Sequence, residues 1–164
     1  MLVVIDIGNT NITMGIYKEN KLLGNYRLTT KMKRTSDEYG FMLMNFLQAS
    51  KVESDEIQDV IVSSVVPKIM HSFLNSIRKY MHKEPIVVGP GIKTGISVKA
   101  ENPKAVGADR IVDAAGAFYE YGGPCLVVDF GTATTFDYVD EHGNFEYGAI
   151  TFGIETGAQA MWTQ

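Results

Sequence analysis

Two short motifs contain side chains that could bind a phosphate group together with its metal ion. Asp6-Ile7-Gly8-Asn9-Thr10 follows the apolar run Leu2–Ile5, and Asp129-Phe130-Gly131-Thr132-Ala133 follows the apolar run Leu126–Val128. A glycine after a buried strand lets backbone N–H groups approach an anionic oxygen closely. An aspartate at the strand end can hold Mg²⁺, which takes few carboxylates and keeps several waters. Both motifs therefore predict phosphate-binding loops.

The two motifs belong to a longer internal repeat. Asp129 lies 123 positions after Asp6 (129 − 6), and the same offset places Gly143, in the second polar turn, opposite Asn20 in the first. A lone Asp-x-Gly is a common turn, but two copies in matched strand–turn–strand contexts indicate duplication. Chance similarity of two β-hairpins is the alternative. Two such hairpins facing each other would hold a nucleoside triphosphate between two lobes. The sequence contains neither a Walker loop nor a protein-kinase glycine-rich loop.

The elements around these motifs alternate between strand and helix, which favours an α/β fold. The capping-box pattern Thr35-Ser36-Asp37-Glu38 predicts a helix to about Ala49, and Pro67 suits the first turn of a second helix. A third helix is expected over Ala105–Tyr121, after a long loop over Gly89–Pro103. We expect Trp162 to pack in a core. Apolar runs predict the strands, namely Leu2–Ile5, Asn11–Tyr17, Leu22–Thr29, Val60–Val62, Pro85–Val88 and Leu126–Val128. Two more strands are expected in the second hairpin, one before and one after its polar turn Asp140–Asn144.

Composition narrows the function classes. The chain has 164 residues, 45% of them hydrophobic and 21% charged, and a net charge of −4. This balance predicts a globular protein, and the acidic charge argues against a nucleic-acid partner. One cysteine, Cys125, excludes an internal disulfide framework. No apolar run approaches the roughly 18 residues of a membrane span, and Met1 is followed by no basic region typical of a signal peptide. We therefore expect a cytoplasmic protein without a membrane partner.

Three motifs in this order resemble the signature motifs of type III pantothenate kinases. They are Asp6–Asn11, Gly107-Ala108-Asp109-Arg110 and Asp129–Thr135, with smaller echoes at Ser64–Pro67 and Asn102-Pro103. The resemblance implies an α/β fold of ribonuclease-H-like (actin-like ATPase) lobes with mixed sheets. It predicts one complete lobe over residues 1–115 and the start of a second, incomplete lobe over 116–164, since only 14 residues follow Ile150.

The same resemblance implies an activity. Members of this family phosphorylate the primary hydroxyl of pantothenate with ATP, which gives 4′-phosphopantothenate in the first step of coenzyme A biosynthesis. They use Mg²⁺ and a monovalent cation, K⁺ or NH₄⁺, and form homodimers. Two other functions stay open, namely a non-catalytic regulatory or nucleotide-binding relative, and another small-molecule kinase on the same fold.

Residue roles follow from the resemblance, position by position. Asp109 matches the general base, although the residues alone favour a helix-surface carboxylate paired with Arg110. Asp6 matches a magnesium ligand, with a turn-capping carboxylate as the alternative, and Asp129 matches the monovalent-cation site. ATP and its phosphates would contact Asp6, Ile7, Gly8, Asn9, Thr10, Asn11, Ile12, Thr13 and Thr132. Pantothenate would contact Gly107, Ala108, Asp109, Arg110 and Ala100.

Two positions depart from the family pattern. Ala100 stands where the family commonly has an aromatic residue near the Asn-Pro pair, and Phe152 stands where the adenosine motif usually has proline.

Arg110 fits a substrate carboxylate, because its planar guanidinium can bind both oxygens.

Overall fold

The computed structural model describes residues 1–89 and 92–163. The chain divides into two compact units, Met1–Gly89 and Pro90–Gln164. This division differs from the expected boundary between residues 115 and 116. The physical reason is that helix α3 (Ala108–Tyr121) packs on the sheet of the second unit, where Ile96, Val98 and Ala100 also join the core.

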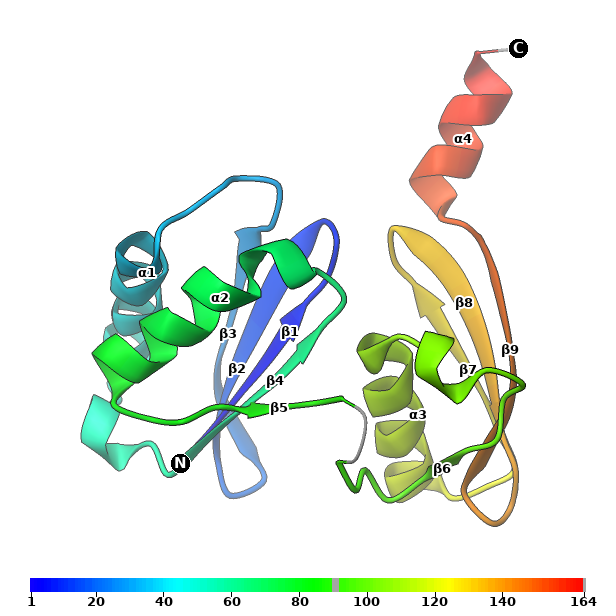
Figure 1. Ribbon diagram of the computed structural model, residues 1–164, viewed down its shortest axis with the longest axis horizontal. Coiled ribbons are helices and arrows are strands. Elements are labelled where there is room, and N and C mark those ends of the chain that lie inside the picture. Colours follow the sequence, from blue (N-terminus) through cyan, green and yellow to red (C-terminus); the bar gives the residue numbers. More distant parts are fainter. Residues whose placement is uncertain (90–91, 164) are drawn as a thin grey trace. The chain divides into compact units, whose positions relative to one another are not determined.

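The first unit is a mixed sheet with helices on one face (Figure 1). The strand order is β3-β2-β1-β4-β5, with β1 antiparallel to β2 and parallel to β4. This arrangement places β1 in the middle of the sheet, so that a residue of β1 has a neighbour on each side. The strands are β1 (Leu2–Ile7), β2 (Asn11–Lys18), β3 (Lys21–Thr29), β4 (Asp59–Ser64) and β5 (Ile86–Val87).

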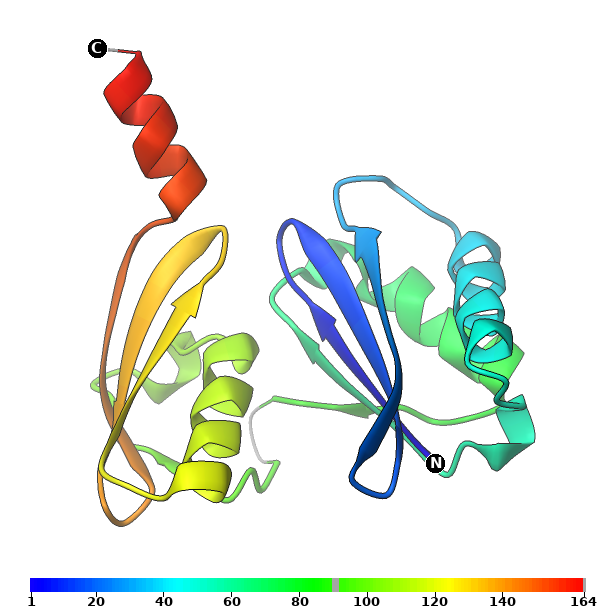
Figure 2. The same ribbon diagram turned by 180° about the vertical axis from the view of Figure 1, so that it is seen from behind.

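Alternation along β1 separates an apolar face from a polar end. Val3, Ile5 and Ile7 are at most 3% exposed and pack against the helices, which lie on one side of the sheet in both views (Figure 1 and Figure 2). Because successive strand residues point to opposite faces, Asp6 belongs to the helix-free face. The helical elements are α1 (Ser36–Ala49), η1 (Ser54–Glu56), α2 (Pro67–Ser76) and the π-helix η2 (Ile77–Met81).

Both expected helix starts are confirmed. The Thr35 hydroxyl accepts a hydrogen bond from the Glu38 backbone N–H at 3.3 Å, and the Glu38 carboxylate accepts one from the Thr35 N–H at 2.7 Å. This reciprocal pair satisfies two N–H groups that the first turn of α1 would otherwise leave unbonded. Pro67 stands at the first position of α2, where its missing N–H costs nothing.

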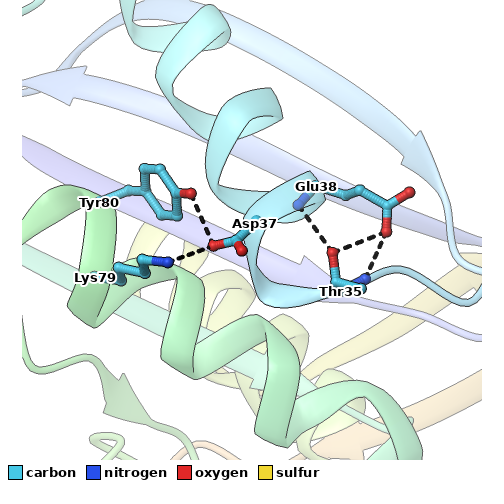
Figure 3. A network of polar contacts seen from close by, with 5 residues as sticks. All are labelled: Thr35, Asp37, Glu38, Lys79 and Tyr80. Atoms are coloured by element: carbon cyan, nitrogen blue, oxygen red, sulfur yellow. Dashed lines mark hydrogen bonds and ion pairs between the residues drawn. The ribbon is translucent and has the colours of Figure 1, made fainter.

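A surface network joins the start of α1 to η2 (Figure 3). The Asp37 carboxylate accepts hydrogen bonds from Lys79 Nζ at 2.7 Å and from the Tyr80 hydroxyl at 2.8 Å. These two hydrogen bonds hold the pKa of Asp37 below its usual value of 3.8. The Tyr80 ring fills the space beside Gly40, where any side chain would overlap it. The network therefore fixes the π-helical turn against α1.

The second unit has its own sheet, in the order β6-β9-β8-β7. A two-residue strand, β6, lies within the segment expected to be a plain loop, because it pairs in parallel with β9; residues 90 and 91 of that segment lie outside the described residues. The elements are β6 (Ser97–Val98), η3 (Pro103–Ala105), α3, β7 (Cys125–Phe130), β8 (Ala133–Val139), β9 (Asn144–Phe152) and α4 (Ile154–Trp162).

The strand pairing confirms the internal repeat and corrects its register. Ile7 pairs with Ile12, whereas its equivalent Phe130 pairs with Thr134, so the loop of the second copy is one residue shorter. The offset along β8 is therefore 122 and not 123. At this offset the two copies share a β-bulge, between Ile16 and Tyr17 in β2 and between Tyr138 and Val139 in β8. A bulge shared at the equivalent position is hard to explain by chance similarity, because bulges are specific features of a fold.

The two copies differ in which face is covered. Leu126, Val128 and Phe130 occupy the positions of the buried β1 residues, yet they are 62%, 38% and 68% exposed. In this unit α3 covers the opposite face, on which Cys125 and Val139 lie.

Helix α4 follows directly after β9 (Figure 1) and presents Trp162 at 88% exposure, so the expectation of a core position for Trp162 is wrong. Within the described ranges, no helix is both long and apolar enough to cross a membrane.

The Asp37 network predicts a pH-dependent contribution to stability. Since the folded-state pKa of Asp37 is depressed, its contribution is present above the unfolded-state pKa and is lost as the pH falls through the folded-state value. Asp37→Asn should lower the thermal unfolding midpoint at neutral pH, with a smaller deficit near pH 3. The effect should be modest and sensitive to salt, because the group is exposed. Asp55→Asn, on the exposed η1, is the control, and an Asp37→Asn deficit that is equal at both pH values would contradict the prediction.

Candidate functional site

The first glycine loop is short and internally braced. The Gly8 N–H donates to the Asn11 carbonyl at 2.9 Å, and the Thr30 N–H donates to the Thr10 carbonyl at 2.9 Å. The Thr30 hydroxyl, in a residue only 5% exposed, donates to the Gly8 carbonyl at 2.8 Å. A Cβ on Gly8 would lie 3.2 Å from the Asn11 carbonyl oxygen, so glycine suits this tight turn. The loop therefore holds a fixed backbone at the end of β1.

The predicted phosphate contacts divide into two groups. Ile7 and Ile12 are 0% and 2% exposed and belong to the core, so only their backbone atoms remain for a ligand. Asn9 is exposed, and Thr10 and Asn11 are half-buried at the turn. The loop can therefore offer side-chain amide and hydroxyl groups as well as backbone groups to an anion.

A row of polar residues crosses the helix-free face beside this loop. Asp6 of β1 is paired in register with Thr13 of β2 on one side and with Ser63 of β4 on the other. Thr13 is in turn paired with Arg27 of β3, so that a cationic residue ends the row. All four alternate with residues that face the core, which places them on one face. We refer to Ser63, Asp6, Thr13 and Arg27 as the polar row.

Sequence reasoning missed Ser63 and Arg27. Neither belongs to the glycine motif, and their proximity to Asp6 follows from strand order and register. Strand order depends on long-range pairing, which local patterns do not specify.

The oxygen atoms of the polar row fit a magnesium ion. Asp6 provides an exposed carboxylate, Thr13 a hydroxyl next to it, and Ser63 a buried hydroxyl that has no hydrogen-bond partner. Among the residues that the structure describes, no three His, Cys, Asp or Glu side chains gather as a metal cage. Mg²⁺ is commonly held by one or two carboxylates, water and substrate phosphates, and a single carboxylate with hydroxyl neighbours suits that chemistry. Bound there, the ion would neutralise phosphate charge.

The second glycine loop repeats the first with a different brace. The Gly131 N–H donates to the Ala133 carbonyl at 3.0 Å, which closes the shorter turn. Asp129 Oδ2 lies 3.2 Å from the position of a Cβ on Gly131, so this carboxylate turns toward its own loop. Gly153 stands where Thr30 stands in the first copy, and a Cβ there would lie 2.5 Å from the Thr132 carbonyl oxygen. The second loop therefore has no side-chain hydroxyl at the position equivalent to Thr30, where the first loop has one.

Asp109 lies in the first turn of α3, two residues after the N-cap residue Gly107. Asp109 Oδ1 accepts a hydrogen bond from the backbone N–H of Arg110 at 2.8 Å. The Arg110 side chain, however, pairs with Asp137 of β8, so the expected surface pairing of Asp109 with Arg110 is wrong. One carboxylate oxygen is thus held by the helix backbone, and Asp109 stays half-buried at the helix N-terminus.

Arg110 forms a buried ion pair with Asp137. Its Nε donates to the two carboxylate oxygens at 3.0 and 3.2 Å, and Nη2 makes a further short contact with Oδ1. The side chains are 13% and 2% exposed. The guanidinium also lies 5.6 Å from the centre of the Phe145 ring, and a side chain on Gly148 would overlap it. Within the described residues, the contacts with Asp137 engage Nε and Nη2 of Arg110. Nη1 takes no part in them and is left for another acceptor.

Asp137 is a second residue that sequence reasoning missed. It lies inside the threonine-rich strand β8, where its spacing from Arg110 gives no local signal. The remaining predicted substrate residues lie nearby in the chain: Gly107 and Ala108 are half-buried at the start of α3, and Ala100 packs against the second core.

Comparison with known proteins identifies close relatives. The family model described as type III pantothenate kinase matches residues 2–164. The type III pantothenate kinase of Bifidobacterium longum subsp. infantis is 54% identical over 164 residues, which are 100% of this chain and 64% of that protein. That of Listeria innocua is 50% identical, again over 100% of this chain and 63% of the relative. The chain thus spans less than two thirds of the length of these curated relatives.

Solved structures show the same fold at low sequence identity. A Ppx/GppA phosphatase from Aquifex aeolicus matches with a TM-score of 0.53 and 17% identity over 99% of this chain and 56% of the other. The activator of 2-hydroxyisocaproyl-CoA dehydratase from Clostridium difficile, solved with bound ADPNP, matches with a TM-score of 0.54 and 12% identity over 92% and 45%. These similarities establish the actin-like ATPase fold that the motifs predicted.

The buried ion pair gives a stability prediction. Asp137→Ala leaves the Arg110 guanidinium buried without its counter-charge, and removal of one partner of such a pair typically costs about 3–5 kcal/mol. Denaturant unfolding followed by circular dichroism measures this loss. Glu84→Ala, which breaks the exposed pair with Arg78, is the matched control and should have little effect. Equal, small effects of the two substitutions would show that the Arg110–Asp137 pair does not stabilise the second unit.

Proposed function

The chain belongs to the type III pantothenate kinase family, and on that premise we propose that the protein transfers the γ-phosphoryl group of ATP to the primary hydroxyl of pantothenate. The product would be 4′-phosphopantothenate, and the reaction the first step of coenzyme A biosynthesis. The observation that supports this proposal most strongly is the family match over residues 2–164. The curated relatives are longer, and this chain matches only part of each of them. The proposal therefore carries over to this chain the activity for which those longer proteins are named.

Asp109 is the general base of the proposed reaction. The Arg110 N–H holds Asp109 Oδ1, so Oδ2 is the oxygen that can accept the proton of the attacking hydroxyl. A base must lie within hydrogen-bond distance of that proton. Gly107 and Ala108 would line the same substrate site, with Ala100 in the place of a family aromatic residue. Phosphoryl transfer otherwise depends mainly on positioning and on stabilisation of charge.

Arg110 would bind the substrate carboxylate through the part of its guanidinium that Asp137 leaves available. Asp137 engages Nε and Nη2, and Nη1 therefore faces away from that pair. The ion pair thereby orients the guanidinium before substrate arrives. Preorganised donors of this kind lose little freedom on binding.

The glycine loops would bind the phosphates, and ions would neutralise them. In the first unit the phosphate contacts are Gly8, Asn9, Thr10, Asn11 and Thr13, with Asp6 as the magnesium ligand and backbone atoms of Ile7 and Ile12. In the second unit Thr132 would contact the nucleotide, and Asp129 would hold the monovalent cation, K⁺ or NH₄⁺. We further propose a cytoplasmic location and, as the family resemblance implies for the full-length protein, a homodimer. The net charge of −4 argues against a nucleic-acid partner.

A coupled assay of ADP release tests the proposal. ADP should form only with pantothenate, Mg²⁺ and K⁺ all present, and removal of Mg²⁺ with EDTA should stop the reaction. Asp109→Asn should lower kcat by about 10²–10⁴-fold, which is the usual contribution of a general base. Glu120→Gln, the same chemical change near the exposed end of α3, should leave kcat unchanged.

Two outcomes would contradict the proposal in different ways. ADP release that is equal with and without pantothenate would exclude this substrate. Binding of an ATP analogue without any turnover by the wild-type chain would instead favour the non-catalytic, nucleotide-binding alternative.

A further inference from the structure

The hydroxyl of Ser63 is buried and unpartnered. The residue is 5% exposed, and Oγ has no hydrogen-bond partner. A buried hydroxyl without a partner is unfavourable, because it has lost its bonds to water and gained none in return. Such a group calls for a physical explanation, and a common one is a ligand, ion or water that completes it in the working protein.

The position of Ser63 points to what that partner is. Ser63 and Asp6 are in-register neighbours on the parallel strands β4 and β1. Val60 and Val62 of β4 face the helix-covered core, so Ser63 lies on the same face as Asp6. Neighbouring strands lie about 4.8 Å apart. A ligand bound by the Asp6 carboxylate is therefore also within reach of the Ser63 hydroxyl.

The neighbouring serine shows that the arrangement is particular to position 63. The Ser64 hydroxyl accepts a hydrogen bond from the Val66 N–H at 3.1 Å and so shapes the turn before α2. Ser76, which is also buried, donates to the Phe73 carbonyl at 2.6 Å. Both have structural roles within the fold, whereas Ser63 has no such role among the described residues.

From these observations we propose that Ser63 is a positioning residue for a divalent cation, whose hydroxyl accepts a hydrogen bond from a water molecule in the hydration shell of an ion held by Asp6. The inference rests on the proposed nucleotide site. It assigns to the end of β4 a role that the glycine motif alone does not contain. Mg²⁺ keeps several of its waters in protein sites, so an outer hydroxyl can orient the ion without binding it directly.

This role and a structural role predict opposite effects of one substitution. Ser63→Ala removes a hydroxyl that has no partner in the fold, so the unfolding midpoint should stay the same or rise. Affinity for the ion should fall by about tenfold, at the lower end of the usual effect of outer-shell substitutions. Ser76→Ala is the matched control: it loses a hydrogen bond of the fold, so its unfolding midpoint should fall and its ion affinity should stay unchanged.

The experiment is an electron paramagnetic resonance titration with Mn²⁺ as the probe, on the full chain with a non-hydrolysable ATP analogue. Thermal unfolding is measured on the same samples. Weaker Mn²⁺ binding by Ser63→Ala at unchanged or higher thermal stability would support the proposal. Mn²⁺ affinity within twofold of wild type would overturn the role of Ser63 and leave the proposed function intact. A wild-type chain that binds no Mn²⁺ with the analogue would overturn both.

Discussion

The pairing of β1 with two neighbours is the constraint on which the first unit depends. Its apolar residues are committed to the helix-covered core, and alternation then forces Asp6 onto the other face, at the strand end. The antiparallel partner β2 contributes Thr13 beside it, and the parallel partner β4 contributes Ser63. A one-residue slip of either strand would move these side chains into the core, because the side-chain period of a strand is two. The chemistry of the loop is therefore tied to the packing of the core.

The second unit uses a buried ion pair to the same end. Arg110 in the first turn of α3 pairs with Asp137 of β8, so the start of the helix is fixed on the sheet. Asp109, one residue earlier, is positioned by the same attachment. A buried pair needs well-placed partners to offset the loss of water. Gly148 provides the space that the guanidinium requires, and Phe145 the ring beneath it.

Local sequence signals predicted much of this structure. The capping box at Thr35, the proline at the start of α2 and the duplicated Asp-x-Gly hairpins all depend on contacts between near neighbours, and each is confirmed. Asp137 and Ser63 were missed because their partners are distant in sequence and become neighbours only through strand order. The shorter loop of the second copy was missed for a related reason. The turn that follows β8 is one residue longer than its counterpart after β2, so the constant offset of 123 between the motifs and between the turns hides the missing residue. The unit boundary at Gly89 depends on which sheet α3 packs against, which helix periodicity does not show.

Phosphate binding by both copies of the duplicated hairpin, as proposed, should protect the backbone amides of both glycine loops. Amide hydrogen exchange measures this protection, with the protein alone and with Mg²⁺ and a non-hydrolysable ATP analogue. We expect slower exchange over Gly8–Asn11 and over Gly131–Ala133 when the analogue is present, with little change in the β2–β3 turn at Glu19 and Asn20. Unchanged exchange in both loops, under conditions where the analogue is bound, would contradict it.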